Sequence, residues 1–117
     1  MDVIEQMMRG AAEILAKILF NKTIPKEFYA QIAVMDLDEL AFLLSALVTA
    51  GRLEQAEEIL FTQFELNPSE ELYDLGIEMY GQMSVYSDDE LKNFDFSREE
   101  IDRGIADIEK LFKAVKA

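Results

Sequence analysis

The sequence predicts an all-α fold of about five helices, arranged as an antiparallel helical array that forms a single domain over residues 1–117. Apolar residues recur at three- and four-residue spacing along most of the chain, which gathers them on one face of a helix. The breaks between these runs hold residues that begin or end helices, such as Gly51, Pro68 and Ser97. A chain of 117 residues has the size of one domain with a modest core.

A first helix is expected over residues 2–20, where a wide apolar stripe follows one side. The stripe consists of Val3, Ile4, Met7, Met8, Ala11, Ile14, Leu15, Ile18 and Leu19. So wide a face requires two neighbouring helices to cover it. Pro25 suits the first turn of a short second helix, and Asp36 suits the N-cap of the helix after it.

Residues 37–68 predict a helical hairpin in which two apolar faces flank a turn at Gly51. The faces are formed by Leu37, Leu40, Leu44 and Leu47 before the turn and by Leu53, Ala56, Leu60 and Phe64 after it. A glycine just past a helix suits the left-handed C′ position, because it has no Cβ to clash there. Ala56 is expected where the two helices cross most closely, and Pro68 is expected to stop the second helix.

This hairpin resembles the tetratricopeptide repeat, a helix–turn–helix unit that stacks into arrays. The match consists of the spacing of Gly51, Leu53, Ala56, Leu60 and Pro68. A partial second match follows at Leu72, Leu75, Gly76 and Met79, so the resemblance covers residues 37–83 and implies tetratricopeptide-like packing in the middle of the array. The whole chain also resembles a group of short bacterial proteins of unknown function, chiefly through Asp-Phe-Ser-Arg-Glu-Glu-Ile at residues 95–101. That second resemblance implies no activity.

Capping patterns predict where the C-terminal helices begin. Asn67 or Ser69 can cap one helix, and a single helical turn is expected at residues 87–91. The final helix is expected to begin at Ser97, which can cap its first amides while Glu100 reaches back. The apolar residues of that helix predict a seam that closes the fold, formed by Ile101, Ile105, Ile108, Phe112 and Val115.

The residue types exclude much catalytic chemistry. The chain has no cysteine and no histidine, so it lacks thiolate nucleophiles, thiolate metal sites and the usual base for neutral pH. It also has no glycine-rich phosphate loop and no serine elbow. We therefore expect no enzyme, no catalytic residue, no cofactor and no bound metal. A rival hypothesis is a magnesium-dependent hydrolase using carboxylate pairs such as Asp36 with Glu39, although charge preference at helix starts also explains such pairs.

Charge is distributed unevenly along the chain. Residues 36–91 carry the whole formal net charge of −13 and contain one basic residue, Arg52. Such an acidic middle repels nucleic acid and anionic membranes, and it is either a solvated face or a docking surface for a basic peptide or protein. Apolar runs fall short of the roughly 20 residues that span a bilayer, and no signal-peptide pattern opens the chain, so we expect a cytoplasmic location.

The leading hypothesis is a small non-catalytic protein-interaction module with an acidic surface, and a structural homodimer is the alternative. In the tetratricopeptide family the inner face of the first helices binds ligands. The resemblance places that candidate partner-binding face at Asp38, Ala41, Ser45, Val48, Thr49, Asp74 and Glu78. Phe42 and Phe61 fall outside the main apolar stripes, so other helices cover them or they form an association surface.

Overall fold

The computed structural model describes residues 3–21 and 23–116, with side chains from residue 9 onward. Seven α-helices and no strand occupy this part of the chain, which confirms the all-α class. They are α1 (Val3–Leu19), α2 (Lys26–Ala33), α3 (Leu37–Thr49), α4 (Leu53–Leu66), α5 (Glu70–Met83), α6 (Asp88–Asn93) and α7 (Arg98–Lys116). The expected number of about five is wrong. Seven helices are present in the described part of the chain when the two short ones are counted: α2, predicted as a short helix, and α6, predicted as a single turn.

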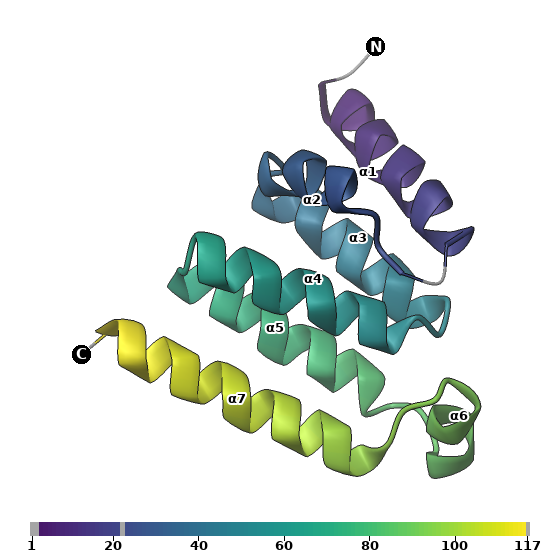
Figure 1. Ribbon diagram of the computed structural model, residues 1–117, viewed down its shortest axis with the longest axis vertical. Coiled ribbons are helices and arrows are strands. Elements are labelled where there is room, and N and C mark those ends of the chain that lie inside the picture. Colours follow the sequence, from purple (N-terminus) through teal and green to yellow (C-terminus); the bar gives the residue numbers. More distant parts are fainter. Residues whose placement is uncertain (1–2, 22, 117) are drawn as a thin grey trace.

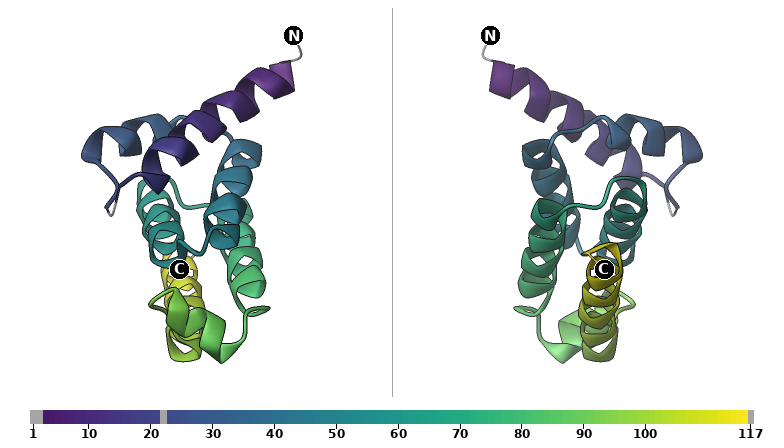
Figure 2. Two further views of the ribbon diagram at one scale, coloured as in Figure 1. Left: turned by 90° about the vertical axis from the view of Figure 1, so that its right-hand side faces the viewer. Right: turned by 90° about the vertical axis from the view of Figure 1, so that its left-hand side faces the viewer.

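Helices α3–α4 and α5–α7 form two consecutive hairpins, with the short α6 inserted into the second of them, and α1 and the short α2 precede them (Figure 1). Helix α3 packs on α1, α4 and α5, and α5 in turn packs on α4 and α7. Figure 2 shows α2, α4 and α7 in one layer, α3 and α5 in the other, and α1 crossing one end. The two hairpins therefore pack on each other and α1 packs on the first of them, as the units of a stacked array do.

The turn between α3 and α4 has the predicted geometry. Gly51 adopts a left-handed φ of 78°, and its N–H donates to the Val48 carbonyl at 3.0 Å. The Arg52 N–H donates to the Leu47 carbonyl at 2.8 Å, which completes the Schellman arrangement that ends many helices. Ala56, expected at the closest approach of the two helices, is fully buried. The prediction of a hairpin centred on Gly51 is confirmed.

Four helices begin with the side-chain caps that the sequence predicts. The cap oxygens of α3, α5, α6 and α7 accept backbone N–H groups at 2.8, 3.1, 3.1 and 3.2 Å. The capping residues are Asp36, Ser69, Ser87 and Ser97. Each cap satisfies one amide that the first turn of its helix leaves without a partner.

The connection between α5 and α7 is held by Arg98. Its guanidinium donates to the backbone carbonyls of Ser84 at 3.0 Å and of Tyr86 at 2.7 Å. The same group pairs with the Asp88 carboxylate at 3.0 Å. One side chain at the start of α7 thus fixes both the end of α5 and the start of α6.

This connection also packs against the end of α3. The Tyr86 hydroxyl donates to the Val48 carbonyl at 2.8 Å, and the Tyr86 ring meets the Phe94 ring with centroids 5.0 Å apart. The Phe94 ring in turn fills the space beside Gly51, where an added Cβ would lie 2.5 Å from it. The connection that leads into α7 is therefore held against the α3–α4 turn, while α7 itself packs on α5.

The predicted apolar seam of α7 is shorter than expected. Ile101 and Ile108 are buried, while Phe112 is half-buried and stacks on Tyr73 with ring centroids 4.5 Å apart. Val115 is 53% exposed. The last turn of α7 extends past the helices on which the rest of it packs, so the inclusion of Val115 in the seam is wrong.

Ser97→Ala is expected to destabilise the protein by about 1 kcal/mol, because it removes the N-cap of α7. Ser84→Ala is the matched control, since the exposed Ser84 hydroxyl only adds a second donor to the Tyr80 carbonyl. Urea unfolding of both variants measures the difference. An unchanged midpoint for Ser97→Ala would show that the cap does not stabilise α7.

Candidate functional site

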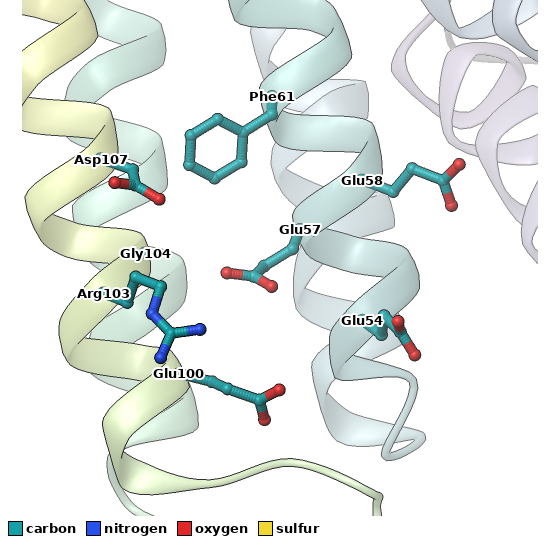
Figure 3. A pocket seen from close by; sticks show the side chains of 8 residues that line it. All are labelled: Glu54, Glu57, Glu58, Phe61, Glu100, Arg103, Gly104 and Asp107. Atoms are coloured by element: carbon teal, nitrogen blue, oxygen red, sulfur yellow. The ribbon is translucent and has the colours of Figure 1, made fainter.

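A groove of about 530 Å³ lies between α4 and α7. It is lined by Glu54, Glu57, Glu58, Phe61, Glu100, Arg103, Gly104 and Asp107. Figure 3 shows Glu57 and Phe61 of α4 pointing toward α7, and Glu100 and Asp107 of α7 pointing toward α4, whereas Glu58 extends away from α7. We call this space the α4–α7 groove.

Helical spacing on two separate helices builds this groove. On α4, Glu54, Glu57 and Phe61 recur three and four positions apart, so they share one side of the helix, with Glu58 at its edge. On α7, positions 100, 103, 104 and 107 do the same. Because α7 packs chiefly on α5, the two acidic sides face each other across an open space with α5 beneath it.

The floor of the groove is a contact between three helices. Tyr80 of α5 is fully buried, and its hydroxyl donates to the Glu57 carboxylate of α4 at 2.6 Å. The Tyr80 hydroxyl also lies against Gly104 of α7, so closely that a Cβ at position 104 would overlap it. Glycine in a helix interior lowers helix stability by about 1 kcal/mol. At position 104 the missing side chain leaves the space that the Tyr80 hydroxyl occupies.

The electrostatics of the groove centre on Glu57. Burial raises the pKa of Glu57 above its ordinary value of 4.5, and the Tyr80 hydrogen bond partly opposes this rise. The negative charges of Glu100, Glu54 and Asp107 raise the Glu57 pKa further. Burial and the neighbouring Glu57 also raise the pKa of Tyr80, so Tyr80 remains a hydrogen-bond donor at neutral pH.

Basic side chains do little to neutralise this surface. Arg52 is the one basic residue within residues 36–91, and its guanidinium donates to the carbonyls of Leu19 and Asn21 at the end of α1. That position also places its positive charge at the negative end of the α1 dipole. Among the described residues, Arg103 is the one basic side chain that lines the α4–α7 groove. The groove therefore presents an excess of negative charge.

The partner-binding face predicted from the sequence is only partly gathered. Ala41, Ser45 and Glu78 line a smaller groove of about 260 Å³ between α3 and α5, together with Phe42, Leu44, Leu75, Met79 and Gln82. We call it the α3–α5 groove. The remaining predicted residues are placed elsewhere: Asp38, Thr49 and Asp74 are exposed outside its lining, and Val48 is buried in the core. A binding role for this face stays a prediction.

The two aromatic residues outside the apolar stripes lie in different grooves. Phe42 is 38% exposed and lines the α3–α5 groove. Phe61 is half-buried against the core and lines the α4–α7 groove. Neighbouring helices cover each ring in part, and the association surface predicted for the pair stays a prediction.

The residues at the centre of the α4–α7 groove were not singled out from the sequence. Glu57, Gly104 and Tyr80 belong to helices whose pairing the sequence does not reveal. The sequence feature that could have indicated this groove is that Phe61 lies close along its helix to three acidic residues, Glu54, Glu57 and Glu58. Glu100 was expected to reach back to Ser97; its backbone N–H does donate to the Ser97 hydroxyl at 3.2 Å, but its side chain points into the groove (Figure 3).

Over residues 3–21 and 23–116, no three or more carboxylates are grouped in a way that could hold a metal ion. Of the helices that the structure describes, none combines the length and the apolar character needed to cross a membrane.

The fold and its grooves define a small, acidic array of helical hairpins. The chain belongs to a family of unknown function, DUF6483, whose model matches residues 1–113. No curated protein and no solved structure matches the chain. The description of the family names neither an activity nor a ligand.

Proposed function

We propose that this protein is a non-catalytic interaction module whose α4–α7 groove binds a basic segment of another protein. The observation that carries the proposal is the composition of the groove: carboxylates from two facing helices line it together with the Phe61 ring, and Arg103 is the one basic side chain among its described lining residues. A segment with lysine or arginine side chains complements this charge.

The physical conditions in the groove favour such a ligand. Charges interact more strongly where part of the surrounding water is excluded, and the Glu57 carboxylate is half-buried at the groove floor. The Phe61 ring offers an apolar contact and a face over which an ammonium or guanidinium group can lie. A volume of about 530 Å³ falls within the range of known ligand sites, which is roughly 300 to 1,000 Å³.

The α3–α5 groove is a second candidate surface for the same function. We propose that the hairpins pack in the tetratricopeptide manner, which is supported by the left-handed Gly51, the buried Ala56 and the packing of each hairpin on the next. Proteins of that family bind ligands on the inner face of their first helices, which corresponds here to α3 and α5. The α3–α5 groove is smaller, and Glu78 is the one acidic side chain among its described lining residues.

Two charge reversals distinguish the grooves. Asp107→Lys changes an exposed residue in the middle of α7 that points into the α4–α7 groove, and Glu78→Lys makes the same change in the α3–α5 groove. Peptides are first selected from a random phage-displayed library on the full-length protein, and their affinities are then measured by fluorescence anisotropy. We expect the selected peptides to be rich in lysine and arginine, and to bind more weakly as salt rises.

Asp107→Lys is expected to weaken this binding by about tenfold or more, a change of about 1.4 kcal/mol, while Glu78→Lys changes it by less than about twofold. The opposite pattern would place binding in the α3–α5 groove. Selected peptides without basic residues, or affinities unchanged in both variants, would contradict the proposal of a basic ligand.

A further inference from the structure

The Glu57 carboxyl group lies where three helices meet. It extends from α4, accepts the Tyr80 hydroxyl of α5 at 2.6 Å, and faces α7 across the groove. The titratable and charged groups around it are Glu54 and Glu58 on its own helix, Tyr80 on α5, and Glu100, Arg103 and Asp107 on α7. Four of these six groups are carboxylates, so an ionised Glu57 has more negative than positive neighbours.

The neutral form of Glu57 is therefore favoured in the empty groove, and the ionised form is favoured when a cation is bound. The neutral carboxyl group suits the empty groove, because it is half-buried and adds no charge beside Glu100 and Asp107. In either state an oxygen of Glu57 can accept the Tyr80 hydroxyl. A cation in the groove favours the ionised form of Glu57 over the neutral form, because only the ionised carboxylate carries a charge that attracts it.

We propose that binding at the α4–α7 groove is proton-linked through Glu57: a basic segment binds as Glu57 gives up its proton, and acidification releases the segment. This inference rests on the proposed function, and it adds a form of regulation to that site. Glu57 is a positioning and sensing residue here, with Tyr80 holding it in place from below.

The sign of the effect follows from linkage. The folded protein holds the Glu57 proton more tightly than the unfolded chain does, because its pKa is raised above the ordinary 4.5. The contribution of Glu57 to stability is thus fully present below that ordinary value and is lost as pH rises through the folded pKa. A bound cation favours the ionised form, so the affinity for a basic segment rises with pH over the same window.

A ligand-free measurement tests the sensing residue itself. Glu57→Gln keeps an oxygen acceptor for Tyr80 and removes the titrating group. The full chain is labelled with ¹³C to follow the Glu57 carboxyl signal by NMR, and unfolding of both proteins is followed between about pH 5 and about pH 8. We expect Glu57 to titrate above its ordinary range, and the variant to gain stability relative to the wild type as pH rises. An ordinary titration with equal pH profiles would overturn the proton link.

A binding measurement tests the coupling, with a fluorescein-labelled hexa-arginine peptide as the probe at constant ionic strength. Between about pH 5 and about pH 8 we expect the affinity of the wild type to rise at least threefold more than that of Glu57→Gln. Asp102→Asn removes an exposed carboxylate of α7 that lies outside the groove lining, and it should keep the wild-type profile. Binding with the same profile in wild type and Glu57→Gln overturns this inference alone. No binding of the peptide to the wild type at any pH overturns the proposed function and the inference with it.

Discussion

Replacing Gly51 by alanine is expected to destabilise the protein by about 2 to 4 kcal/mol. Two costs add at this position. An alanine must adopt the left-handed φ of 78°, and its Cβ would lie 2.5 Å from the Phe94 ring. The ring cannot move freely, because it packs edge-on against Tyr86, which is itself hydrogen-bonded to the end of α3. Urea unfolding at neutral pH measures the loss.

A double-mutant cycle separates the two costs. In a Phe94→Ala background the space beside Gly51 is open, so Gly51→Ala should cost only the backbone strain of about 1 to 2 kcal/mol. An equal loss in both backgrounds would show that the Phe94 ring does not constrain Gly51. No loss in either background would contradict the left-handed turn between α3 and α4.

Gly104→Ala is expected to destabilise the protein by about 1 to 2 kcal/mol, even though alanine favours a helix over glycine by about 1 kcal/mol. The new methyl group would overlap the Tyr80 hydroxyl and force Tyr80 away from Glu57. Gly81→Ala is the control, because Gly81 lies in the last turn of α5 with open space where its Cβ would be, and it should gain up to about 1 kcal/mol. If both variants are stabilised in urea, α5 and α7 do not cross as closely as described.

The helix ends were predictable because local chemistry decides them. Gly51 lacks a side chain, so it readily adopts the left-handed conformation of its turn. Asp36, Ser69 and Ser87 each precede a helix and accept a hydrogen bond from an amide in its first turn. These signals require only a few consecutive residues. The Ser97 cap was predictable for the same reason, and it correctly places the start of α7.

The arrangement of α6 and α7 depends on contacts between residues far apart in the sequence. The Tyr86 hydroxyl donates to the carbonyl of Val48, and the Phe94 ring packs against Gly51. No local sequence pattern predicts either contact. The turn after α6 also uses Asp95 at a left-handed φ of 55°, where a glycine would have been the recognisable signal. Capping therefore predicts a helical turn at residues 87–91, but the place of α6 in the fold depends on these distant partners.

The candidate site was missed for the same physical reason. Each half of the α4–α7 groove has the spacing of an ordinary solvated helix side: Glu54 and Glu57 on α4, and Glu100, Arg103 and Asp107 on α7, recur three or four positions apart. The groove exists only because α7 packs on α5 and leaves its acidic side facing α4. The raised pKa of Glu57 depends on that same pairing, since Glu100 and Asp107 come from the facing helix.

Mapping the binding surface by NMR tests the central claim most directly. The ¹⁵N-labelled full-length protein is titrated with the strongest basic peptide from the phage selection, and amide shifts are followed residue by residue. The account predicts that the largest shifts fall on α4 and α7, including the amides of Glu57, Gly104 and Asp107, and that Asp107→Lys reduces them at the same peptide concentration. Shifts concentrated on Ala41, Ser45 and Glu78 of the α3–α5 groove would contradict the claim that the α4–α7 groove is the binding site.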